Sequence, residues 1–211
     1  MGFLTQTRFP GLWRVFQHWI GGTVDKRALC TLKFDGQSSV LEVGCSLGNI
    51  SRVFVQYKRI QYTGIDVDPV VIEYARKSFS AQKNFTFICE DLSRLPKTRA
   101  GFGYVLFAGI LHHLPDDKCR EILAAARNHI EFDGRLVAVE PLIPRSDDPW
   151  FLSQFMKLEQ GEHLRTGPEL RALLDSVPGF RFMDAEEHLI GCSPFHRPIC
   201  ARFGVYTLLP T

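Results

Sequence analysis

The chain has 211 residues, of which 45% are hydrophobic and 23% are charged. These proportions are typical of one globular domain that is large enough to bury a core. The net charge is +2, from 25 basic and 23 acidic residues. Because the charges are nearly balanced, a nucleic-acid partner is not expected. No two of the six cysteines form a Cys-x-x-Cys pair. We therefore expect reduced thiols, a cytoplasmic protein and no bound metal.

No apolar run in the sequence approaches the roughly 18 residues that a transmembrane helix needs. The first residues also lack the features of a secretory signal, which are a charged start, an apolar stretch and a small-residue cleavage site. We expect no membrane span and a single domain over residues 1–211, acting as a monomer or a homodimer.

Residues 1–35 come before the first expected strand and carry one apolar helical face. This face consists of residues spaced three or four apart, as on one side of a helix: Leu12, Val15, Phe16 and Trp19. We expect this segment to form a helical cap over the functional cleft.

Residues 36–140 alternate short apolar runs with helical patterns. Asp68 and Pro69 supply a cap and a first helical residue for a helix over residues 68–78. Strands that alternate with helices predict a parallel sheet covered on both faces. The other expected helices span residues 51–57 and 115–130, and the expected strands span residues 40–43, 60–65, 85–89, 104–108 and 134–139.

The last third of the chain follows a different pattern. Residues 141–168 interrupt the alternation and contain a group of large apolar side chains, so we expect a lid that shapes a substrate pocket. Residues 169–211 contain a helix and two long strands, over residues 180–190 and 197–208. The connection between these strands is too short for a parallel crossover, so they should pair antiparallel.

Polar groups follow three successive strands, at the edge where parallel sheets bind ligands. Glu42 precedes a glycine turn, Gly44–Gly48, which lets the backbone approach a ligand and opens a helix. Asp66 ends the second strand and can accept hydrogen bonds from ribose hydroxyls. Asp91 follows the third strand, where it can accept from an adenine amino group, and Leu92 offers its backbone N–H to the ring. Each signal is weak alone, but together they indicate a nucleoside site.

This succession resembles the class I S-adenosylmethionine-dependent methyltransferases of small-molecule type. Their first motif is similar to apolar-Leu-Asp/Glu-x-Gly-x-Gly-x-Gly, and Leu41–Gly48 match it with Ser46 in place of the middle glycine. The resemblance implies a doubly wound α/β fold with a mostly parallel seven-stranded sheet and a C-terminal antiparallel pair. It covers about residues 38–140 and continues through Gly64–Asp66, Cys89–Leu92, Gly109–Leu114 and Gly134–Val137.

The resemblance implies S-adenosyl-L-methionine as the cofactor and S-adenosyl-L-homocysteine as the product. It places Gly44 at the methionine part, Asp66 at the ribose and Asp91 at the adenine. It also implies that the backbone of Ala108 and Gly109 lies beside the methionine part. The expected cofactor-binding residues are Glu42, Gly44, Cys45, Ser46, Gly48, Asp66, Val67, Asp91, Leu92, Ala108 and Gly109.

Two histidines and one carboxylate are candidate catalytic groups. His112 and His113 are adjacent, so at most one should face the pocket, and we favour His113 as a base or a substrate-orienting donor. Glu140, at the end of the fifth strand, is the further candidate. A histidine packed in the core and a carboxylate paired with an arginine are the structural alternatives for these residues.

Four residues are candidates for substrate recognition. They are His113, Arg165, Trp150 and Phe155. Arg165 suits a substrate carboxylate or phosphate, although a surface arginine is the alternative. The aromatic side chains favour a small, partly apolar molecule.

The expected function is methyl transfer to an O, N or C atom of a small molecule. A nicotinamide-binding Rossmann turn would need Gly-x-Gly-x-x-Gly, but Ser46 and Asn49 stand at its second and third glycine positions. The Asn/Asp-Pro-Pro-Tyr/Phe motif of amino-methylating nucleic-acid enzymes is missing, because Ala108–Leu111 occupy its place. A protein or RNA substrate, or a catalytically silent scaffold protein, remains an alternative.

Overall fold

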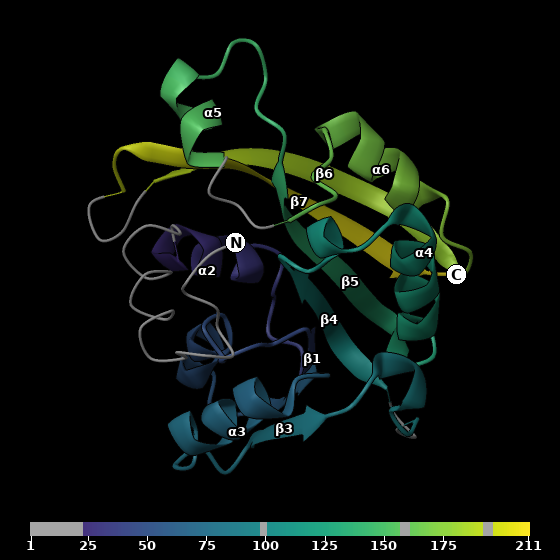
Figure 1. Ribbon diagram of the computed structural model, residues 1–211. Helices are drawn as coiled ribbons and strands as arrows, with labels where there is room; N and C mark the ends of the chain where they lie inside the picture. Colours follow the sequence, from purple (N-terminus) through teal and green to yellow (C-terminus); the bar gives the residue numbers. More distant parts are fainter. Residues whose placement is uncertain (1–22, 98–100, 157–160, 192–195) are drawn as a thin grey trace.

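A computed structural model describes residues 23–97, 101–156, 161–191 and 196–211 (Figure 1). The apolar face that we expect over Leu12 to Trp19 lies outside these residues. The described chain contains a sheet of seven strands in the order β3-β2-β1-β4-β5-β7-β6. The strands are β1 (Ser39–Val43), β2 (Gln61–Asp66), β3 (Phe85–Cys89), β4 (Phe102–Ala108), β5 (Ile130–Leu142), β6 (Phe180–Gly191) and β7 (Ile199–Pro210).

The pairing of the strands confirms the expected fold class. β1 pairs parallel with both β2 and β4, and β3 and β5 extend the parallel sheet on either side. β7 then pairs antiparallel with β5 and with β6. The strand order reverses between β1 and β4, so the carboxyl ends of these two strands border the crevice where open α/β sheets bind ligands.

Helices cover both faces of this sheet (Figure 1). One face packs against α2 (Thr23–Thr31), the 3₁₀ helix η1 (Ser51–Gln56), α3 (Pro69–Ser78) and α5 (Trp150–Met156), as shown by the shared core of Cys30, Phe54, Ile72 and Leu152. The other face packs against η2 (Leu92–Arg94), α4 (Asp116–Ala126) and α6 (Gly167–Asp175), through Leu92, Leu123 and Leu173. Burial of both faces explains why the central strands are almost entirely apolar.

Local signals define the ends of two helices. The Asp68 side chain accepts a hydrogen bond from Val70 N at 2.8 Å and Pro69 is the first residue of α3, as expected. Thr166 and Glu169 form a capping box at the start of α6, each side chain bonding the other's backbone N–H.

Three expected elements differ from the structure. The helix expected over residues 51–57 is the 3₁₀ helix η1. The helix expected over residues 115–130 ends at Ala126, because Ile130 instead pairs with Phe102 and begins β5. β5 also runs past residue 139 to Leu142, because β7 pairs with it that far. The segment expected to form a lid from residue 141 therefore begins inside a buried strand.

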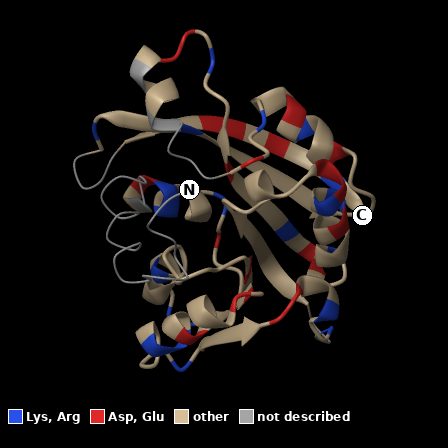
Figure 2. Ribbon diagram, viewed as in Figure 1, with Lys and Arg blue, Asp and Glu red and all other residues tan. Residues whose placement is uncertain are grey.

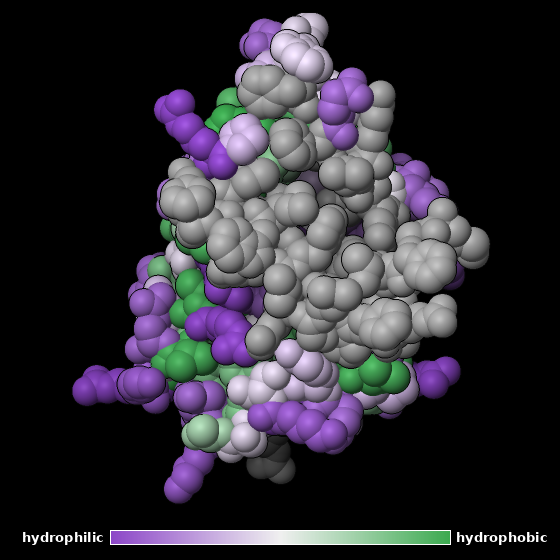
Figure 3. All heavy atoms as spheres, turned by 60° about the vertical axis from the view of Figure 1, so that its left-hand side comes forward, coloured by the Kyte–Doolittle hydropathy of each residue, from purple (hydrophilic) through white to green (hydrophobic). Residues whose placement is uncertain are grey.

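None of the helices within the described ranges is long and apolar enough to cross a membrane. Figure 2 shows basic residues scattered over several elements and a run of acidic residues along β6. On the face seen in Figure 3, hydrophobic and hydrophilic residues alternate in small groups around the residues that are not described. Among the described residues in Figure 2, the basic positions belong to several separate elements rather than to one stripe.

Candidate functional site

The turn after β1 adopts the backbone that its glycines were expected to allow. Gly44 and Gly48 have φ of +70° and +77°, and Ser46 has φ of +49°. Left-handed backbone costs a non-glycine residue about 1 kcal/mol or more. Ser46 therefore keeps a glycine-like conformation at the position where the motif has glycine. Gly44 N and Cys45 N both donate to Ile65 O, at 2.8 and 2.9 Å, which ties the turn to β2.

Asp66 holds the same turn from the end of β2. Its Oδ2 accepts from Ser46 N at 3.0 Å and its Oδ1 accepts from Asp68 N at 3.0 Å. A carboxylate offers about four acceptor sites, so Asp66 keeps acceptor capacity for a ribose hydroxyl. Burial raises the pKa of Asp66 from its ordinary value. The neighbouring Val67 side chain is 68% exposed at this edge, where it can lie against a base.

Asp91 lies after β3, where it caps η2. Its Oδ1 accepts from Ser93 N at 2.7 Å and from Ser93 Oγ at 2.6 Å. These bonds lower the pKa of Asp91, so the exposed carboxylate is ionised near neutral pH. The Leu92 side chain is buried, so only its backbone N–H can serve a ligand.

Two of the expected cofactor residues direct their side chains into the core. The Glu42 carboxylate is 2% exposed and accepts from Ser51 Oγ at 3.0 Å and from Tyr62 O–H. Burial raises its pKa to about 7. The Cys45 side chain is also buried. This corrects the expectation of direct cofactor contacts for the Glu42 side chain: it supports the turn and η1 from below, and Cys45 offers only its backbone.

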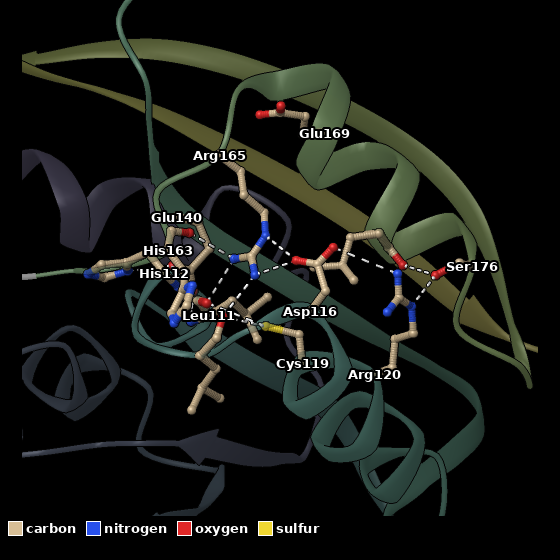
Figure 4. Close-up of polar contacts among 12 residues, drawn as sticks. Leu111, His112, Asp116, Cys119, Arg120, Glu140, His163, Arg165, Glu169 and Ser176 are labelled. Atoms are coloured by element: carbon tan, nitrogen blue, oxygen red, sulfur yellow. Dashed lines mark hydrogen bonds and ion pairs between the residues drawn. The ribbon is translucent and has the colours of Figure 1, made fainter.

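The loop after β4 is organised by Glu140 (Figure 4). The Glu140 carboxylate is 1% exposed and accepts from Ile110 N at 2.9 Å and Leu111 N at 3.0 Å. It also lies 2.8 Å from His112 Nδ1. Burial alone would raise the pKa of Glu140, but the hydrogen bonds from His112 and from the two amides outweigh it and lower the pKa. No arginine pairs with Glu140 in the described residues, contrary to the alternative considered above.

The two histidines occupy different environments in η3 (Leu111–His113). His112 is 5% exposed against Glu140, whereas His113 is exposed. This revises the preference for His113 as the base. An ionised carboxylate accepts but cannot donate, so in neutral His112 the proton sits on Nδ1 and Nε2 carries the lone pair. The sequence motif alone could not separate the two residues, because the partner that does so lies on another strand.

Arg165 is a structural residue (Figure 4). Its side chain bonds Asp116 Oδ1 through Nε at 2.9 Å and Nη2 at 2.7 Å. The remaining donors bond the backbone carbonyls of Leu111, Leu114 and His163, at 2.8–3.0 Å. All five N–H donors of the guanidinium are therefore used within the chain. This corrects both expectations for Arg165, since it is neither a surface residue nor available to a substrate anion.

The aromatic residues of the expected lid lie on or near α5. Trp150 begins this helix with 79% of its side-chain surface exposed, while Leu152 is buried against the sheet. The side chain of Phe155 lies outside the described residues. α5 and α2 thus cover the same face of the sheet.

Sequence reasoning missed Lys26 as a residue of this site. Its Nζ reaches the end of β4, where a Cβ built on Gly109 would lie 2.3 Å from it. Gly109 has φ of +71°, so the backbone conformation favours glycine there. The adjacent basic pair Lys26-Arg27 was the available signal, but it says nothing about what the side chains reach.

Comparison with known proteins supports the same fold. Residues 40–134 match a family model described as a methyltransferase domain. An isoflavone 7-O-methyltransferase of Glycyrrhiza echinata is 26% identical over 124 residues, which are 56% of this chain and 32% of that protein.

Solved structures are similar over nearly all of the chain. Mitomycin 7-O-methyltransferase MmcR has a TM-score of 0.72 at 19% identity, over 96% of this chain and 57% of its own. A Burkholderia thailandensis 1,6-didemethyltoxoflavin-N1-methyltransferase has a TM-score of 0.67 at 18% identity, over 100% of this chain and 92% of its own. This chain spans about a third of the isoflavone enzyme and just over half of MmcR. Residues 40–134 are thus similar to a methyltransferase domain, within a chain that has the fold of the class I methyltransferases.

Proposed function

We propose that this protein transfers a methyl group from S-adenosyl-L-methionine to a small molecule and releases S-adenosyl-L-homocysteine. The observation that carries the proposal is the shared position of the glycine turn, Asp66 and Asp91 at one edge of the sheet. The printed names of the relatives favour small acceptors: an isoflavone and mitomycin at oxygen, and 1,6-didemethyltoxoflavin at nitrogen. The last of these structures contains S-adenosylhomocysteine.

The residues present fit the cofactor. Gly44 and Gly48 contribute no side chains of their own to the turn, so its backbone can face the methionine part. Asp66 retains acceptor capacity for the ribose, and Asp91 with the Leu92 N–H suits the adenine. Gly109 contributes no side chain beside the methionine part, and Lys26 Nζ lies next to it.

The bound cofactor supplies a methyl group on a sulfonium, already activated for in-line displacement. The chain itself has to align the acceptor and exclude water. We propose that the segments containing α2 and α5 do this by covering the core of residues 36–140, with the exposed His113 and Trp150 contacting the substrate.

His112 is our choice for the base when the acceptor is a hydroxyl. Its ring lies beside the β4 end, with Cε1 3.5 Å from a Cβ built on Gly109. Glu140 orients the ring and holds the proton on Nδ1, so that Nε2 can accept the acceptor's proton. Glu140 is a positioning residue in this scheme, because it acts through His112.

We further propose a cytoplasmic location. Four of the five cysteines in the described residues are buried, as core-filling thiols are in reduced proteins. Cys89 is the exposed one, because β3 is an edge strand.

Parallel calorimetric titrations with S-adenosylmethionine, S-adenosylhomocysteine and NAD test the proposal. We expect binding near micromolar for the two sulfur compounds and none for NAD. A panel of small hydroxylated and N-heterocyclic acceptors with a labelled methyl donor then tests transfer. Binding of NAD alone would contradict the cofactor assignment. Tight binding of S-adenosylmethionine with no transfer to small molecules, peptides or RNA would favour the silent scaffold.

A further inference from the structure

Two residues of α2, Asp25 and Arg27, attach this helix across the carboxyl edge of the sheet. Asp25 Oδ2 accepts from Gly191 N at 2.9 Å, at the end of β6. Arg27 Nε donates to Asn49 O, directly after the glycine turn. Lys26 lies between these two anchored residues on α2.

Lys26 projects toward the position that we assign to the methionine part of the cofactor. Its Nζ lies next to Gly109 and 5.4 Å from the centre of the Phe203 ring on β7. Its positive charge also acts on Glu42 beneath the glycine turn, where it lowers the pKa against the larger effect of burial. The ammonium is therefore close to both loops that border the crevice between β1 and β4.

No hydrogen bond or ion pair joins the Lys26 ammonium to a carboxylate within the described ranges. The carboxylates that belong to the two loops bordering the crevice are already engaged, Glu42 with Ser51 and Tyr62, and Glu140 with the loop after β4. An ammonium has three N–H donors and no acceptor, so it is suited to an anionic ligand.

We propose that Lys26 binds the α-carboxylate of the amino-acid part of the cofactor. This rests on the proposed function and adds a determinant outside the glycine motif, contributed by α2. Charge-assisted hydrogen bonds from an ammonium to a carboxylate are about twice as strong as neutral ones. The cofactor carries its carboxylate on the same methionine part that Gly109 is expected to flank, and Gly109 lets Lys26 reach it.

Calorimetry with two ligands tests this assignment. S-adenosylhomocysteine carries the carboxylate, and its decarboxylated form keeps the adenosine, thioether and amine but lacks that group. We expect the wild-type protein to prefer S-adenosylhomocysteine by roughly 10- to 100-fold. Lys26→Gln should lose that preference by weakening S-adenosylhomocysteine alone, and Lys26→Arg should retain most of it.

Lys77→Gln is the matched control. It removes the same charge from a side chain that is 74% exposed on α3, and should bind both ligands like the wild type. Thermal melting of each variant shows whether α2 remains in place. The assignment is overturned if Lys26→Gln weakens both ligands equally or keeps the full preference. A wild-type protein that binds neither ligand would contradict the proposed function itself.

Discussion

The Glu140 carboxylate lies 2.8 Å from His112 Nδ1 and also accepts the backbone N–H of His112 at 3.3 Å. One buried group thus orients the imidazole and fixes the backbone that carries it. Because the carboxylate also bonds the two preceding amides, it organises the whole loop that follows β4. Stability and catalysis should therefore depend on the same residue.

Glu140→Gln is expected to damage both properties. In either orientation of the glutamine side chain, its NH₂ group faces N–H donors that now bond to the carboxylate of Glu140. Two donors then face each other, which is unfavourable. We expect a loss of about 3–5 kcal/mol in the free energy of unfolding and a fall in kcat of about 10²- to 10⁴-fold. Urea denaturation and turnover measure the two effects. Glu121→Gln, at a side chain that is 64% exposed, should change neither. Unaltered stability in Glu140→Gln would contradict the buried network.

His112→Asn tests the choice of base. Asparagine can still donate to Glu140, so the fold should survive, but it has no ring nitrogen to accept a proton. We expect kcat to fall by about 10²- to 10⁴-fold with unchanged affinity for S-adenosylhomocysteine. The matched variant His113→Asn should affect the KM of the acceptor more than kcat. The assignment fails if His113→Asn carries the larger loss of kcat.

Asp66→Asn tests the ribose contact. Its amide NH₂ would face the N–H of either Ser46 or Asp68, and the negative charge is lost. We expect affinity for S-adenosylhomocysteine to fall by about 10- to 100-fold, measured by calorimetry. Asp68→Asn is the control, because asparagine caps a helix as well as aspartate does. Equal losses in the two variants would mean that Asp66 acts only through the loop.

Glu42→Gln should have a stability effect that depends on pH. The folded-state pKa of Glu42 is about 7, above the ordinary value of 4.5. Between these values the folded protein keeps a proton that the unfolded chain releases, so the free energy of unfolding falls as pH rises, until pH passes about 7. Glutamine removes this dependence. Denaturation should show that, from pH 5 to pH 8, the free energy of unfolding of the variant rises relative to that of the wild type by up to about 3 kcal/mol. A difference independent of pH would contradict the raised pKa.

Arg165→Lys separates structure from substrate binding. Lysine cannot replace five donors in a fixed plane, so carbonyls after β4 lose their partners. We expect the unfolding free energy to fall by about 2–4 kcal/mol, while the acceptor's KM at a temperature where the variant is folded stays unchanged. Arg120→Lys, at a side chain 46% exposed, is the control for stability. A selective rise in KM would restore the substrate role.

The sequence by itself determined the fold class, the helix that Asp68 and Pro69 begin, the antiparallel C-terminal pair and the position of the glycine turn. These features depend on short-range signals: capping residues, apolar periodicity, connection length and the freedom of glycine. The strands were located to within a few residues, except where β5 continues along a partner that lies far away in the chain.

The tertiary structure alone decided what the polar side chains contact. Glu140, on β5, contacts His112 and not His113. Arg165 bonds a loop about fifty residues earlier in the chain. Lys26 extends from α2 to Gly109. Such partners are set by the strand order and by how the helices cross the sheet, and no local pattern contains them. Hydrogen bonds act over about 3 Å, so a role that depends on one is fixed only when the fold brings distant residues together.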